Sequence, residues 1–181
     1  MRPGRARAGV TALVLAVGVA SVAGIAAGAA SASESRCRIR PRAVCAGANL
    51  ARRNLSRSDL QGADLRGADL SRSDLRGADL RDANLTQANL FGARLGGARL
   101  VDAKLTGANF ATADLRDTKF VRALLTAADL RGAELNGADL TDAFLTDAVF
   151  TGSHGATRAM LDRANYCDTT LPGGEIVLTD C

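Results

Sequence analysis

The residues best suited to chemistry in this sequence of 181 residues are four cysteines and a single histidine, His154. The cysteines stand toward the two ends of the chain, as Cys37 and Cys45 and as Cys167 and Cys181. Four cysteines in an exported chain favour disulfides, and they allow three pairings. A zinc site is the alternative, but one histidine and two cysteines at an end do not supply its usual four ligands. We expect no metal and no cofactor, and no catalytic role for His154, because no nucleophile is spaced to work with it.

Three basic residues spaced five apart form a second candidate site. Arg94, Arg99 and Lys104 stand where the surrounding sequence mostly has Asp or Asn. Together they could bind an acidic group of a partner. As ordinary surface residues they would instead pair with nearby carboxylates such as Asp102 or Asp117. We call Arg94, Arg99 and Lys104 the basic belt.

These residues belong to a strict repeat of five. From Leu50 to Phe150 every fifth residue is Leu or Phe, and the residue two positions earlier is usually Ala. In an α-helix a step of five residues turns by about 500°, so these side chains would scatter around the helix. In a flat strand an odd period places alternate side chains on opposite faces. A chain that turns a corner every five residues lets each Leu face one shared axis.

Four such corners close a coil of about 20 residues, and stacked coils pair as parallel strands about 4.8 Å apart. The repeat, as in Ala63-Asp64-Leu65, resembles the A(D/N)LXX consensus of the pentapeptide-repeat family over residues 48–152. The resemblance implies an all-β fold, a right-handed quadrilateral parallel β-helix, here a solenoid of about six coils. A rod filled with side chains has no cleft for catalysis, so we expect no enzymatic activity.

The rod constrains the cysteine pairing. A rod of six coils is about 29 Å long, whereas a disulfide needs Cα atoms within about 7 Å, so the two ends cannot be bridged. We therefore expect the disulfides Cys37–Cys45 and Cys167–Cys181. The first would fasten an N-terminal cap at residues 33–47.

The frame of the repeat slips by one residue within 151–156, which we interpret as a bulged corner. The position that holds Leu or Phe in every repeat is then occupied by Leu161, Tyr166 and Leu171. We expect a slipped last coil and a C-terminal cap over residues 153–181. The turn that ends the coil is Leu171-Pro172-Gly173-Gly174.

One face of the rod departs from the polar pattern. Residues 20 apart should stack on the same face, and there Leu124 and Phe144 stand where Asp or Asn is usual. Because apolar side chains gain nothing in water, we expect the C-terminal segment 175–180 to cover them, or a partner or second copy to bind them. A column of threonines accompanies them. We call the following residues the apolar–threonine patch: Leu124, Phe144, Thr106, Thr126 and Thr146.

Residues 1–32 have the composition of a signal peptide. Arg2, Arg5 and Arg7 precede an uncharged run rich in Ala, Val, Gly and Leu that ends in Ala30-Ser31-Ala32. We expect cleavage after Ala32 and a secreted or extracytoplasmic protein. The alternative is an uncleaved segment that anchors the protein, and without such an anchor we expect no membrane contact.

The net charge of the protein limits the classes of partner that it can bind. The formal net charge is +4, but removing residues 1–32 leaves 20 basic and 19 acidic residues, a net charge of +1. Nucleic acid is therefore not expected. We favour an exported structural or protein-interaction module, whose partner is an unknown protein, a cell-envelope component or a second copy. The resemblance offers an alternative, because some members of the family mimic DNA, bind gyrase and confer quinolone resistance. The signal peptide and the arginines interleaved with Asp59–Asp79 argue against that alternative.

Overall fold

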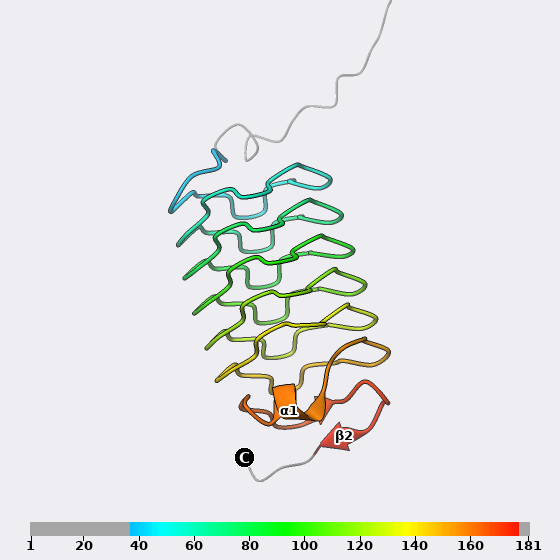
Figure 1. Cartoon of the computed structure of the whole chain (residues 1–181). Coiled ribbons are helices and arrows are strands. Elements are labelled where there is room, and N and C mark those ends of the chain that lie inside the picture. Colours follow the sequence, from blue (N-terminus) through cyan, green and yellow to red (C-terminus); the bar gives the residue numbers. More distant parts are fainter. Residues whose placement is uncertain (1–36, 178–181) are drawn as a thin grey trace, which may run out of the picture.

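The computed structural model describes residues 37–177, which form a rod of stacked square coils (Figure 1). Residues 20 apart pair as parallel bridges, which confirms the coil length. The rod has four faces, and we number them by the first residue of each bridged column: Val44, Asn49, Asn54 and Asp59. Each face contributes one bridged residue per coil, so the ladders consist of single bridges and not of long strands.

The corners of the coil are four-residue turns that begin at the Leu. The N–H three residues later donates to the Leu carbonyl, as from Ala63 to Leu60 at 3.0 Å and from Ala98 to Leu95 at 2.8 Å. The third residue of each turn between Arg42 and Gly152 has a φ between 55° and 76°, which together with the hydrogen bond defines a type II turn. This position favours glycine, and elsewhere the chain holds an ordinary L-residue there at an energetic cost.

The interior of the rod is a ladder of leucines and small residues, as the repeat predicts. Leu65 and Ala63 are fully buried, and the same holds in coil after coil. The larger rings of Phe110 and Phe120 fit by packing edge to face, with centroids 5.9 Å apart. The buried hydroxyl of Thr118 donates to the Leu95 carbonyl at 2.9 Å.

The slip after the regular coils is confirmed, and the register locates it. Glu134 still bridges His154, 20 residues on, whereas Phe144 bridges Asn165, 21 residues on. The inserted residue therefore lies after His154, in the short helix α1 (Arg158–Leu161) or its flanks. The expected bulged corner is replaced by α1, which ends at Leu161. Leu161 keeps the place of a repeat leucine, because it is buried at 5% exposure and its carbonyl accepts the corner hydrogen bond from the Ala164 N–H at 2.8 Å.

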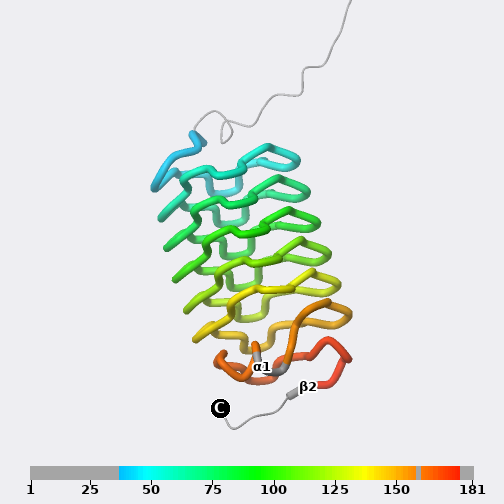
Figure 2. The backbone as a smooth tube through the Cα atoms, viewed as in Figure 1, coloured from blue at the N-terminus to red at the C-terminus, as the bar shows by residue number. Residues whose placement is uncertain are grey.

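The C-terminal cap follows the red end of the tube in Figure 2 and is a two-stranded antiparallel hairpin, whose strand β2 is labelled in Figure 1. Strand β1 (Thr169–Thr170) continues the second face by bridging Val149 and pairs with β2 (Ile176–Val177). The predicted turn between them is present. Gly174 has a φ of 85°, and the Leu171 N–H donates to the Glu175 carbonyl at 2.7 Å.

The N-terminal cap is closed by the predicted disulfide Cys37–Cys45, whose Cα atoms lie 4.7 Å apart. Cys45 occupies a leucine place and is buried. Cys167 is also disulfide-bonded, and its predicted partner Cys181 lies outside the described residues. The predicted signal peptide lies outside them too. Within residues 37–177 no helix is long and apolar enough to cross a membrane.

Candidate interaction surfaces

Most Asp and Asn residues of the repeat have a structural task at the corners. The N–H of the residue after each Leu has no partner in the ladder. The side chain two residues earlier accepts that hydrogen bond, as from Ser71 to Asp69 Oδ1 at 3.0 Å and from Ala111 to Asn109 Oδ1 at 3.0 Å. These residues therefore satisfy exposed or half-buried backbone donors, which is how Asx turns stabilise a chain.

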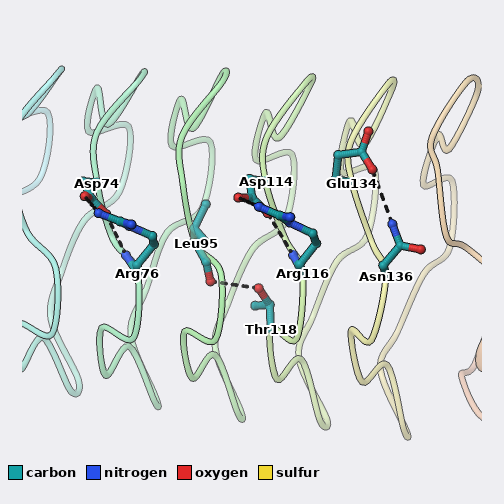
Figure 3. A network of polar contacts seen from close by, with 8 residues as sticks. All are labelled: Asp74, Arg76, Leu95, Asp114, Arg116, Thr118, Glu134 and Asn136. Atoms are coloured by element: carbon teal, nitrogen blue, oxygen red, sulfur yellow. Dashed lines mark hydrogen bonds and ion pairs between the residues drawn. The ribbon is translucent and has the colours of Figure 1, made fainter.

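The carboxylates of the repeat are largely neutralised within their own turn. Where Arg follows Asp by two residues, its guanidinium donates to both carboxylate oxygens, as in Asp74–Arg76 and Asp114–Arg116 on the third face (Figure 3). The hydrogen bonds from Arg76 lower the pKa of Asp74 to about 2. The same pairing recurs in Asp64–Arg66, Asp79–Arg81 and Asp129–Arg131.

The basic belt is spread over three faces. Arg94 bridges Asp74 and Asp114 on the third face, Arg99 lies on the fourth, and Lys104 lies on the first. Asp102 does not pair with the belt, because it binds Arg122 of the next coil at 2.6 Å. Arg99 instead lies 4.0 Å from the carboxylate of Asp79 on the same face. The structure does not gather the three belt side chains around one point.

The apolar–threonine patch, in contrast, is assembled on one face. Leu124 bridges Lys104 on one side and Phe144 on the other along the first face. Thr126 and Thr146 stack at the adjoining corner, since Ala127 donates to the Thr146 carbonyl at 2.8 Å. Phe144 is 44% exposed and Leu124 is half-buried.

The apolar–threonine patch lacks the hydrogen bond by which Asp or Asn caps the N–H two residues later. Asn84 caps the Thr86 N–H at 3.1 Å, but Leu124 and Phe144 have no acceptor, so Thr126 and Thr146 lack a side-chain cap. The patch thus combines exposed apolar area with a missing hydrogen bond. Such a local conflict is typical of functional surfaces.

The described part of the C-terminal segment leaves Phe144 open. Its strand β2 pairs with β1, which belongs to the neighbouring second face. Residues 178–180 of that segment lie outside the described residues.

His154 stands on the third face beside Glu134, with Nδ1 and Oε1 3.3 Å apart. The other oxygen of Glu134 accepts a hydrogen bond from Asn136 at 3.4 Å (Figure 3). The neighbouring Ser153 points the opposite way, into the core, so it cannot serve His154 as a nucleophile. Within residues 37–177 no three Cys, His or carboxylate side chains cluster as metal ligands.

One surface was missed by the sequence analysis, although charge patterning could have found it. Residues 37–58 contain six arginines and no acidic residue. All six are exposed, and none pairs with a carboxylate among the described residues. We call this set the N-terminal arginine cluster: Arg38, Arg40, Arg42, Arg52, Arg53 and Arg57.

The comparisons with known proteins agree with this architecture. The family model described as pentapeptide repeats matches residues 43–82, 83–120 and 118–154. A solved pentapeptide repeat protein of the Arabidopsis thaliana thylakoid lumen is 31% identical, with a TM-score of 0.52 over 64% of this chain and 85% of that chain.

Two further solved structures are similar at lower TM-scores. HetL of Nostoc, involved in the regulation of heterocyst differentiation, is 30% identical over 75% of this chain and 73% of its own, with a TM-score of 0.42. The fluoroquinolone resistance protein QnrB1 is 18% identical over 75% of this chain and 77% of its own, with a TM-score of 0.35. No curated protein matches the sequence. The family model alone spans more than half of the residues, and the chain therefore belongs to the pentapeptide repeat family.

Proposed function

We propose that this protein is an exported, non-enzymatic interaction module, a rigid rod that presents the apolar–threonine patch to a protein partner. The observation that carries the proposal is Phe144, which is 44% exposed in a place where the repeat mostly has a capping Asp or Asn. A partner would shield this ring together with Leu124 and the threonine methyl groups. Contacts of this kind, an aromatic anchor within a flat apolar surface, are typical of protein interfaces.

Flatness supports a protein partner over a small ligand. The patch residues lie on one face and its corner, and stacked coils repeat their side chains at about 4.8 Å. A regular, rigid surface loses little conformational entropy when it binds, which favours affinity. A second copy of the chain or a cell-envelope component could provide the complementary surface.

The DNA-mimic alternative is not favoured. Mimicry of DNA requires a surface of unneutralised acids, whereas five of the carboxylates on the rod bind an arginine two residues away. The likeness to QnrB1 is too distant to bear on function.

The test is a double substitution that should stabilise the fold and abolish partner binding. Leu124→Asp/Phe144→Asp restores the consensus residue at both places, so each new carboxylate can cap the N–H of Thr126 or Thr146. We expect the free energy of unfolding to rise by about 0.5–1 kcal/mol per cap while partner binding is lost.

The matched control is Val149→Asp, which makes the same kind of change on the second face, outside the patch. Partners would be recovered from the extracytoplasmic fraction with the purified protein as bait, and self-association would be measured by sedimentation. Equal recovery by wild type and by the double variant would exclude the patch as the binding site.

Export is tested separately by the intact mass of the protein from culture supernatant. We expect a chain that begins at Ser33 and is lighter by four hydrogens, because two disulfides have formed. A full-length, membrane-bound species would instead identify an anchored rod.

A further inference from the structure

The charges are distributed unevenly along the rod. Residues 37–58 contain six arginines and no acid, whereas residues 134–177 contain seven acids and only two arginines. These two segments lie at opposite ends of the rod, the first at the blue end of the tube in Figure 2 and the second at the orange and red end. The rod is thus basic at its N-terminal end and acidic at its C-terminal end.

The N-terminal arginine cluster is presented by rigid structure. Arg38, Arg40 and Arg42 lie within the loop that the Cys37–Cys45 disulfide closes. Arg42, Arg52 and Arg57 each occupy the third place of a type II corner, with φ values of 55°, 57° and 56°. Arginine side chains therefore project from three of the four corners of the first coil.

The same end exposes two aliphatic side chains. Ile39, between Arg38 and Arg40, is 38% exposed, and Val44 is 71% exposed. Val44 begins the column of the first face, so it is bridged only by Asp64 on its inner side. Nothing among the described residues covers either side chain.

We propose that this end of the rod docks on the surface of an anionic lipid bilayer. Clustered basic residues are attracted to anionic headgroups, and aliphatic side chains between them can enter the interface. A soluble polyanion would attract the arginines but would gain nothing from Ile39 and Val44. The proposal adds a peripheral membrane contact where the sequence analysis expected none in the mature protein.

Docking by this end orients the rod. The acidic C-terminal end is repelled by the anionic surface and points away from it. Phe144 lies five coils from Val44 along the first face, which is about 24 Å at the spacing of stacked strands. The apolar–threonine patch is then held clear of the bilayer.

The test compares binding of the full chain to two kinds of vesicle, so that residues 1–36 are the same in every variant. The vesicles are phosphatidylcholine alone and phosphatidylcholine with a minority of phosphatidylglycerol. We expect tighter binding to the anionic vesicles. Each arginine contributes about fivefold to that binding, so R38Q/R40Q/R42Q should reduce the affinity by roughly a hundredfold. The matched control R66Q/R116Q/R131Q removes the same charge from arginines that are paired with Asp, and its loss should be less than about fivefold.

A second variant separates a bilayer from a soluble polyanion. I39S/V44S should weaken vesicle binding by roughly tenfold and leave binding to soluble polyphosphate unchanged. Circular dichroism and the urea midpoint would verify that each variant is folded.

Three results would overturn the proposal. One is an equal loss of vesicle binding in the two arginine triples, which would make the attraction a property of net charge. Another is tight binding to polyphosphate with no effect of I39S/V44S on vesicles. The third is concentration-dependent self-association that R38Q/R40Q/R42Q abolishes, which would identify the acidic end of a second copy as the partner.

Discussion

Gly155 offers the sharpest test of the packing between the last two coils. It has a φ of 78°, a left-handed conformation that an L-residue adopts at a cost of about 1–2 kcal/mol. A Cβ added there would lie 2.6 Å from the backbone nitrogen of Asn136, which is closer than side chains tolerate. Relieving such an overpacked contact typically costs a further 1–3 kcal/mol or so. We therefore expect Gly155→Ala to reduce the free energy of unfolding by about 2–4 kcal/mol.

Two other glycines serve as controls for the loss of stability expected in Gly155→Ala. Gly132 also has a positive φ, of 64°, but a Cβ there would meet only the Thr112 methyl group at 3.6 Å, an ordinary contact. Gly132→Ala should therefore cost about 1–2 kcal/mol, from the backbone alone. Gly173 has neither a positive φ nor a neighbour within 4 Å, so Gly173→Ala should change stability by less than about 0.5 kcal/mol.

The assay is urea unfolding of the oxidised protein followed by circular dichroism, supported by thermal melting. For a chain of this size, the loss in Gly155→Ala should lower Tm by roughly 6–12 °C. The double variant Asn136→Ala/Gly155→Ala should recover only part of it, because the backbone nitrogen remains in the way. If Gly155→Ala is no more destabilising than Gly132→Ala, the coil after the slip is not packed as tightly as the structure has it.

Two further predictions concern the core and the acid range. Ser153 places a buried hydroxyl without a hydrogen-bond partner among the described residues, so Ser153→Ala should raise the free energy of unfolding by about 1 kcal/mol, measured by the urea midpoint. The matched Ser73→Ala should not stabilise, because that hydroxyl already donates to the Leu70 carbonyl at 2.6 Å, and a gain in both would refute the argument. The pKa of Asp74 is lowered from 3.8 to about 2 by Arg76, so its contribution to stability is present above about pH 4 and is lost as the pH falls toward 2. The urea midpoint should therefore be flat between about pH 7 and 5 and fall below about pH 4, less steeply in Asp74→Asn, and an equal slope in that variant would assign the acid loss to other groups.

Much of the architecture could be predicted because its causes are local. A leucine every five residues and a small residue two places earlier are both requirements of one corner, and repetition turns that corner into a coil. The disulfide Cys37–Cys45 followed from the length of the rod. The stacking of Leu124 on Phe144 and of the threonines on one another was predicted, because it follows directly from the 20-residue coil.

Other features depend on what each coil meets above and below. The one-residue slip was visible as a break in the five-residue repeat. A helical turn and a bulged corner can both accommodate the extra residue, and only the contacts of the last coil select α1. Asp102 had several arginines within reach along the sequence, and the stacking of coils places Arg122 against it.

The sequence by itself determined the five-residue corner, the 20-residue coil, the dry interior of Leu and Ala, and the faces on which side chains stand. The tertiary structure decided which charges are cancelled and which remain. Asp64 and Asp74 are neutralised within their turns. Among residues 37–177, in contrast, no carboxylate pairs with the arginines of the first coil and no further coil covers Val44. Exposure and pairing are properties of neighbours in space, and at the ends of a solenoid those neighbours are missing.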